Sequence, residues 1–309
     1  AQPPAIGEPS TPGFDAKAIA RWNVVPFQTF TGTFLVGVVA FHMNGIDRVE
    51  FSANGGPWVA VREMKLNPQS GTVEYTALLR AADFRDGPVE VRAVVYPREA
   101  GVARVLGGVY DATTAHSGEH ALPLFANARR TLVHEQVHVA MSGNDQNSGT
   151  ATAPVRTLER AFRIVRTGGV PHYATIVVTE AGTYSLPNYT TGSDQFGPVT
   201  TTTNSWVTIR AADGLTDRAV TIGNTERRSV RPRVVRLALE RVQVDFATVS
   251  QFYMDSPIWF HRCHWFDSTG AATVYPGILL PVRGQGYATD STATHLIYGF
   301  AGLMLARGV

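Results

Sequence analysis

The first third of the chain alternates short apolar and polar positions at the period of a β-strand. From Trp22 onward, strand-like stretches alternate with turn sequences such as Asn44-Gly45 and Asp86-Gly87-Pro88. The strands expected from this pattern span residues 33–41, 48–51, 58–61, 73–79, 89–95 and 103–110. Short strands separated by about 10–15 residues predict an antiparallel β-sandwich over residues 22–110. Residues 1–21 carry four prolines and few apolar residues, so we expect an extended N-terminal arm.

Three phrases of this region resemble bacterial immunoglobulin-like or fibronectin-III-like modules. They are residues 45–51, Glu74-Tyr75 and residues 86–93. Such modules serve as spacers or as binding domains, and the resemblance implies one of these roles for the predicted sandwich. The polar residues 111–130 that follow are expected to form a linker.

The hydrophobic period changes in the second half, where one helix is expected. Its apolar residues recur at helical spacing and would share one face, namely Val155, Leu158, Ala161, Phe162 and Val165. Pro154 suits the first turn of this helix, and Gly168-Gly169 suits its end. Strands are expected before the helix over residues 131–141 and after it over residues 175–178, 206–209 and 220–222.

An internal repeat follows these strands. Residues 237–244 align with residues 258–265 at an offset of 21, and in both copies two pairs of apolar residues flank a polar corner. A third copy begins at Leu303. Strand pairs that recur in this way predict a parallel β-solenoid, in which inward residues of one coil stack on the next. The alignment places Cys263 and Trp265 inward, like Val242 and Val244.

Several of these segments resemble right-handed parallel β-helix proteins of the pectate-lyase-like superfamily. The resemblance rests on Ser142-Gly143-Asn144-Asp145, residues 147–150, the helix that begins near Pro154, Gly182-Thr183-Tyr184 and residues 206–211. It implies an all-β chain, in which the sandwich is followed by the helix-capped start of a right-handed β-helix over residues 131–309. The superfamily contains lyases, hydrolases, epimerases, adhesins and phage spikes, so it implies a fold and leaves the activity open.

The repeat at the end of the sequence suggests a partner. Val309 falls within the third repeat, and a solenoid that ended there would expose unpaired strands. We therefore expect other protein chains, or a further C-terminal part of the protein, to cover the open solenoid end near Val309.

Composition excludes several classes of protein. With 44% hydrophobic and 17% charged residues, the chain is expected to be globular, and its net charge of +2 does not predict binding to nucleic acid. No apolar run is long enough for a membrane-spanning helix, and the single Cys263 excludes an internal disulfide. The opening Ala-Gln-Pro-Pro fits a mature N-terminus left by signal-peptide cleavage, so we expect an exported bacterial protein, secreted or at the cell surface.

Two groups of residues are candidates for binding a substrate. Arginines are dense from residue 227 to residue 241, and we single out Arg231, Arg233 and Arg236 as a groove for an acidic polysaccharide. Trp259, His261 and Arg262 form the second group, a surface on which sugar rings could stack. The alternatives are a solvated, salt-bridged face for the arginines, and core packing with ordinary surface polar groups for the second group.

The sequence patterns that could indicate metal binding or catalysis are weaker than those for substrate binding. His261 and His264 are three residues apart on an expected strand and would face different ways, which does not favour a metal site. Asp145 and Asn147 lack the full calcium-loop pattern, so a hydrogen-bonded turn is expected; calcium is the one candidate cofactor, and no motif requires it.

No lysine lies beyond Lys65, so a lyase of this chain would use other groups, and candidates are Tyr253, His261, Arg262, Arg283, Asp290 and His295. A hydrolase would draw on Asp245, Asp255 and Asp267. These residues do not form a recognisable catalytic set, so the catalytic residues remain unknown.

The sequence leaves two functions open. The first is an exported β-helix protein that recognises an extracellular acidic polysaccharide and, if it is an enzyme, cleaves it as a polysaccharide lyase or glycoside hydrolase. The second is a non-catalytic cell-surface or extracellular structural protein, whose β-helix is a scaffold for assembly.

Overall fold

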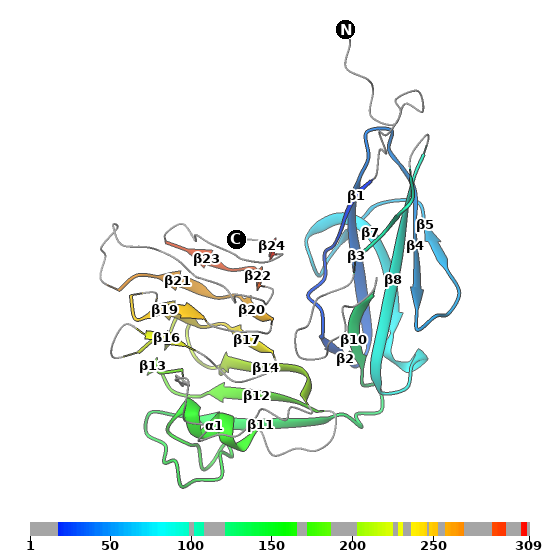
Figure 1. Cartoon of the computed structure of the whole chain (residues 1–309). Coiled ribbons are helices and arrows are strands. Elements are labelled where there is room, and N and C mark those ends of the chain that lie inside the picture. Colours follow the sequence, from blue (N-terminus) through cyan, green and yellow to red (C-terminus); the bar gives the residue numbers. More distant parts are fainter. Residues whose placement is uncertain are drawn as a thin grey trace. The chain divides into compact units, whose positions relative to one another are not determined.

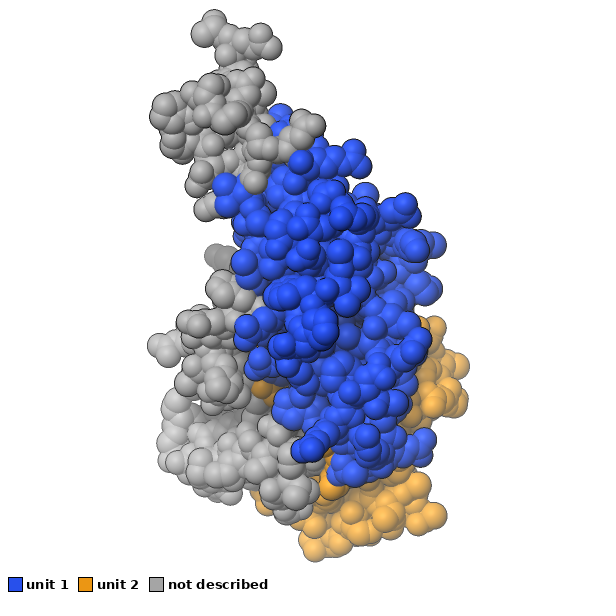
Figure 2. Space-filling model, turned by 90° about the vertical axis from the view of Figure 1, so that its right-hand side faces the viewer, with its two compact units in different colours: residues 1–110, 116–131 blue, residues 111–115, 132–309 orange. Residues whose placement is uncertain are grey.

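A computed structural model describes residues 18–98, 102–107, 121–165, 172–186, 203–224, 228–230, 236–245, 247–252, 257–268, 286–294 and 304–307. The chain divides into two compact units, which are coloured separately in Figure 2. The first contains residues 1–110 and 116–131, and the second contains residues 111–115 and 132–309. Each unit is described by itself.

The first unit consists of two sheets whose strands pair mainly antiparallel (Figure 1). One sheet has the order β1-β3-β7-β6, and the other has the order β2-β10-β8-β4-β5 with β9 paired to β8. The strands are β1 (Ile19–Trp22), β2 (Thr29–Phe30), β3 (Thr33–Phe41), β4 (Ile46–Ala53), β5 (Val59–Val61), β6 (Lys65–Asn67), β7 (Thr72–Arg80), β8 (Gly87–Pro97), β9 (Arg104–Val105) and β10 (Leu122–Ala126). A 3-10 turn, η1 (Ala81–Asp83), follows β7.

Strand β8 shows why this region forms a sheet with one buried face. Val89, Val91, Ala93 and Val95 are at most 1% exposed, and the residues between them are exposed or half-buried. This alternation is the one that a strand requires when only one of its faces packs on a core. The antiparallel sheets expected from the sequence are therefore present.

The predicted arm and linker both need correction at their ends. Strand β1 starts at Ile19 and pairs with β3, so the last residues of the expected arm belong to a sheet. Strand β10 lies within the expected linker 111–130, where it pairs antiparallel with β8 and parallel with β2. Leu122 and Leu124 are fully buried, and this burial is what draws the segment into the sheet. Residues 111–120 of the expected linker lie outside the described residues.

The second unit is built from parallel sheets whose strands stack in sequence order (Figure 1). The largest sheet, here called the seven-stranded sheet, comprises β11 (Val133–Val139), β12 (His172–Val178), β14 (Thr203–Ala211), β17 (Leu237–Glu240), β20 (Ile258–His261), β22 (Gly286–Thr289) and β24 (Met304–Arg307). The five-stranded sheet comprises β13 (Gly182–Tyr184), β15 (Val220–Ile222), β18 (Gln243–Asp245), β21 (His264–Phe266) and β23 (Thr292–Ala293). A third pair joins β16 (Arg228–Val230) to β19 (Val249–Phe252).

Successive coils visit these sheets in turn, which is the architecture of a parallel β-helix. One coil runs through β17, β18 and β19, and the next coil continues through β20 and β21. Each coil forms one rung of the stack, and neighbouring rungs are joined by parallel pairing.

The register confirms the internal repeat. Leu237 lies opposite Ile258, and Val244 lies opposite Trp265, as the offset of 21 residues requires. The third copy is displaced by one residue, because Met304 rather than Leu303 aligns with Gly286 and hence with Ile258. Strand β22 is a rung that the repeat does not reveal, since its inward residues are small.

Inward side chains of successive rungs form the core of the second unit. One column runs through Val137, Ile176, Ile209, Leu239 and Phe260, and all of them are at most 2% exposed. Cys263 and Trp265 lie in the same core, at 2% and 1% exposure, which confirms their predicted inward orientation.

The one helix of the described residues, α1 (Leu158–Ile164), is shorter than the expected one and packs on this core. All five residues of the predicted apolar face are buried in it, from Val155 to Val165. Thr157 is the N-cap, and its side chain accepts a hydrogen bond from the Arg160 backbone N–H. The helix contacts β11, the first rung of the stack (Figure 1). Gly168-Gly169, the expected end of the helix, lies outside the described residues.

Candidate functional site

Most of the predicted binding residues that the structure describes share the outer face of the seven-stranded sheet, the face opposite the core. Because Leu237, Leu239, Ile258 and Phe260 point inward, the residues between them point outward. The register defines two outward ladders, which are Arg210–Glu240–His261–Thr289 and Thr208–Ala238–Trp259–Tyr287. Arg236 precedes Ala238 by two residues and Glu240 by four, so its side chain points to the same face of the sheet. Arg231 and Arg233 lie outside the described residues.

Three aromatic rings from three rungs cluster on this face. The centroid of the Trp206 ring is 5.9 Å from that of Trp259 and 6.3 Å from that of Tyr287. Trp206 and Tyr287 are each 4% exposed, whereas Trp259 is half-buried. The indole N–H of Trp259 donates to Thr289 Oγ1 over 2.9 Å. Trp259 is thus held by its neighbours while part of its ring stays accessible.

His261 lies beside Trp259 and shares the same threonine. Its Nδ1 is 2.8 Å from Thr289 Oγ1 and 3.7 Å from Asp290 Oδ2, and its ring centroid is 5.4 Å from that of Trp259. Thr289 Oγ1 accepts the indole N–H and also lies within hydrogen-bond distance of His261 Nδ1, so one hydroxyl group joins the two rings. Glu240 is the cross-strand neighbour of His261 on the preceding rung.

Arg262 follows at the corner that leads from β20 to β21. It is exposed, and its φ of 52° is in the left-handed region. Its backbone N–H donates to the carbonyl of Thr289 on the next rung over 2.9 Å. Within the described part of the chain, the Arg262 guanidinium has no hydrogen bond or ion pair. The side chain is therefore free to contact a ligand.

Two other arginines near this corner are already paired. Arg210 Nη1 and Arg241 Nη1 lie 2.8 Å and 2.9 Å from Asp213 Oδ1. The hydrogen bond from Arg210, together with the charge of both arginines, holds the pKa of Asp213 below its usual range. These contacts order the neighbouring corner, and the Asp213 carboxylate balances one of the two positive charges.

Arg236 occupies a different environment from the one expected. It shares the outer face with Trp259, but it is 2% exposed. A guanidinium buried to this extent contributes to packing and is not part of an accessible groove. Among the described residues, the candidate surface therefore centres on Trp259, His261 and Arg262.

A second aromatic contact lies on the first rungs of the same face. The rings of His134 and Tyr173 stack at 4.4 Å with an interplanar angle of 11°, and His134 Nε2 is 3.1 Å from Thr175 Oγ1. Burial and, to a smaller extent, the charge of Arg210 lower the pKa of His134. Sequence reasoning missed Tyr173, Trp206 and Tyr287, which could have been found by marking outward positions once the inward ones were assigned.

Of the carboxylates considered for hydrolysis, Asp245 is committed to turn contacts. Asp245 is 6% exposed. It accepts hydrogen bonds from the Ala247 and Ser268 backbone N–H groups and from the Thr248 and Ser268 hydroxyls. Its role is to join two adjacent turns. Asp255 lies outside the described residues, as do Tyr253, Arg283 and His295.

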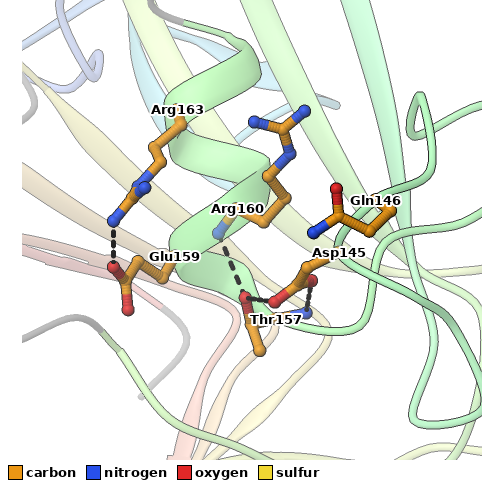
Figure 3. A pocket seen from close by; sticks show the side chains of 6 residues that line it. All are labelled: Asp145, Gln146, Thr157, Glu159, Arg160 and Arg163. Atoms are coloured by element: carbon orange, nitrogen blue, oxygen red, sulfur yellow. Dashed lines mark hydrogen bonds and ion pairs between the residues drawn. The ribbon is translucent and has the colours of Figure 1, made fainter.

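Asp145, in the loop before α1, is likewise engaged. Its carboxylate accepts hydrogen bonds from the Arg156 and Thr157 backbone N–H groups, each over 2.9 Å, and from Thr157 Oγ1 over 2.8 Å. The loop is therefore the hydrogen-bonded turn that the sequence predicts. A polar pocket of about 300 Å³ adjoins it (Figure 3). It is lined by Asp145, Gln146, Thr157, Glu159, Arg160 and Arg163.

Cys263 and His264 each form a hydrogen bond to a neighbouring rung. The Cys263 thiol donates to the Leu239 carbonyl over 3.1 Å, and burial raises its pKa to about 12. His264 Nδ1 is 2.8 Å from Thr292 Oγ1 on the five-stranded sheet. Across the described residues, no group of three or more His, Cys, Asp or Glu side chains could hold a metal ion.

The helix found among the described residues is too short to cross a membrane. Comparisons with protein-family models, curated proteins and solved structures find no match to this chain. The fold and the site together define a β-helix protein preceded by a unit of antiparallel sheets, with an aromatic and charged surface on its largest sheet.

Proposed function

We propose that the outer face of the seven-stranded sheet binds an extracellular acidic polysaccharide. The observation that carries the proposal is the placement of Trp259, which is half-buried against Trp206, lies opposite Tyr287 on the next rung and is fixed by Thr289. An indole held in this way offers a flat apolar surface at little cost in side-chain entropy, and such a surface suits the apolar face of a sugar ring.

Polar groups beside Trp259 supply hydrogen bonds and charge. The half-buried His261 flanks the indole, and the exposed Arg262 lies at the corner of the same rung, whereas the fully buried Thr289 only holds the two rings. A guanidinium matches a carboxylate with two parallel hydrogen bonds, which favours a polymer that contains uronic acids. Arg236 would support the face from within rather than contact the polymer.

The proposal also covers the family and the location of the protein. The stacked parallel sheets and the capping helix support a right-handed β-helix of the pectate-lyase-like superfamily, and the first unit supports an immunoglobulin-like domain that precedes it. A protein of this kind that meets a polysaccharide would be secreted or displayed at a bacterial cell surface. Fractionation of the producing cells, with detection by antibody, tests this location.

Binding is tested by calorimetric titration of the chain with polygalacturonate, alginate and the neutral polymer dextran. We expect the wild-type chain to bind at least one acidic polymer, and Trp259→Ala to weaken that binding about tenfold. Trp259→Phe keeps a ring and should retain most of the affinity. Trp58→Ala is the matched control, because Trp58 is 49% exposed in the first unit. A wild-type chain that binds none of the polymers, or equal affinity in Trp259→Ala, contradicts the proposal.

Cleavage of the polymers is tested separately, with the same purified chain. Elimination from a uronate polymer produces an unsaturated sugar with ultraviolet absorbance, and hydrolysis produces new reducing ends without it. Both readouts, with and without added calcium, distinguish a lyase, a hydrolase and a protein that binds without cleaving.

The second candidate function is a structural scaffold. It is favoured by the engagement of Asp245 and Asp145 in turn contacts, which leaves neither carboxylate free to act as a catalytic acid or base. Its partners would be other protein chains or a further part of the protein. Light scattering of the purified chain without polymer tests it, since a scaffold should assemble, and a monomer at all concentrations contradicts this candidate.

A further inference from the structure

Three charged residues occupy strained corner positions on successive rungs. Arg241, Arg262 and Asp290 have φ values of 55°, 52° and 51°. Each lies between the seven-stranded and the five-stranded sheet, where the Arg241 N–H donates to the His261 carbonyl over 3.0 Å. The left-handed region costs an ordinary residue about 1–2 kcal/mol, and Gly or Asn would occupy it at lower cost. Strain of this kind at a surface is a reason to look for a function.

The three corner side chains differ in whether another charged or titratable side chain lies close to them. Arg241 pairs with Asp213, and Asp290 Oδ2 lies 3.7 Å from His261 Nδ1. Arg262 is exposed between these two pairs, and its guanidinium is unpaired in the part of the chain that the structure describes. It is also the corner residue of the rung that carries Trp259.

We infer that Arg262 is the specificity-determining residue of the outer face, and that it selects polymers with free carboxylates over neutral ones. This inference rests on the proposed function. The backbone of Arg262 is fixed by its hydrogen bond to the next rung, so its side chain starts from a defined corner, from which its planar fork can reach a ligand. A sugar stacked on Trp259 would then offer its own or its neighbour's carboxylate to Arg262.

The test uses two polymers that differ only in charge, polygalacturonate and its fully methyl-esterified form. Arg262→Asn removes the charge and suits the left-handed region, so its thermal unfolding midpoint should equal or exceed that of the wild type. We expect this variant to bind polygalacturonate about tenfold more weakly and the methyl ester unchanged. Arg262→Lys should recover part of the loss, because an ammonium keeps the charge without the fork.

Arg130→Asn is the matched control. Arg130 is an exposed arginine of the first unit with a φ of 57°, and we expect its replacement to leave the affinity for both polymers unchanged. Equal weakening of both polymers in Arg262→Asn, or no weakening of either, overturns the inference while the proposed function stands. A wild-type chain that binds neither polymer overturns the inference, and one that also fails to bind alginate overturns the proposed function as well.

Discussion

Gly37 in β3 lies directly against the carboxyl group of Glu74 in β7. A Cβ atom added at residue 37 would overlap three atoms of that carboxyl group. Glu74 is fully buried, and its Oε1 accepts hydrogen bonds from Asn67 Nδ2 over 2.7 Å and from Ser70 Oγ over 2.8 Å. The glycine thus provides the space in which a buried carboxyl group joins β7 to the end of β6.

Replacement of this glycine should destabilise the first unit. We expect Gly37→Ala to lower the free energy of unfolding by about 1–3 kcal/mol, because the methyl group displaces a side chain held by two hydrogen bonds. Gly32→Ala is the control, since a Cβ atom there meets no atom within 4 Å. Urea unfolding of both variants measures the difference, and equal stability of the two would contradict the close packing.

The turn that starts α1 should depend on Asp145. Asp145→Ala removes three hydrogen bonds from the segment that begins the helix, so we expect a loss of about 2 kcal/mol of stability in the second unit. Asp217→Ala removes a carboxylate that is exposed and makes no contact within the described ranges, and should have little effect. Thermal unfolding monitored by circular dichroism compares the two. An effect of Asp145→Ala no larger than that of Asp217→Ala would refute the role of Asp145 in holding the turn that starts α1.

Cys263 should be unreactive in the folded chain and should make stability fall at high pH. Burial raises its pKa from 9.0 to about 12, so the unfolded chain loses the thiol proton at lower pH than the folded chain. The resulting stabilisation is complete below pH 9 and disappears as the pH rises towards 12. We expect an aromatic disulfide reagent to label Cys263 only in denaturant, and Cys263→Ala to lose less stability across that pH range. Rapid labelling without denaturant would show that the thiol is accessible.

The two faces of β14 should respond differently to truncation. Ile209 is fully buried in the core column, and Thr208 beside it is half-buried on the outer face. We expect Ile209→Ala to cost about 2–5 kcal/mol and Thr208→Ala less than about 1 kcal/mol. Chemical unfolding of both variants checks the alternation, and similar losses would contradict the inward assignment of Ile209.

Sequence patterns predict the rungs that carry large inward side chains. The repeat between Leu237 and Ile258 gives the observed register, because apolar pairs separated by a polar corner can stack in only one alignment. Strand β22 escapes this approach, since its inward residues Gly286 and Ala288 give no hydrophobic signal. The sequence pattern does not predict strand β10 either, because a short apolar stretch interrupted by Pro123 resembles a linker until its partner β8 is known.

The candidate site is predictable only in part for a related reason. Trp259, His261 and Arg262 are adjacent in the sequence and can be singled out from it. Trp206, Tyr287 and Thr289 come from other rungs, and only the register brings them to Trp259. Whether an outward arginine is buried, like Arg236, or exposed, like Arg262, depends on tertiary packing that local sequence does not encode.

Strand pairing in the seven-stranded sheet joins each rung only to its immediate neighbours in the chain. Duplication of one coil by recombination would therefore insert a new layer without disturbing the layers on either side. Each such event would lengthen the outer face by about 4.8 Å, the spacing between adjacent strands. The length of the proposed binding face is thus a quantity that evolution can change in equal steps, independently of the chemistry at any one layer.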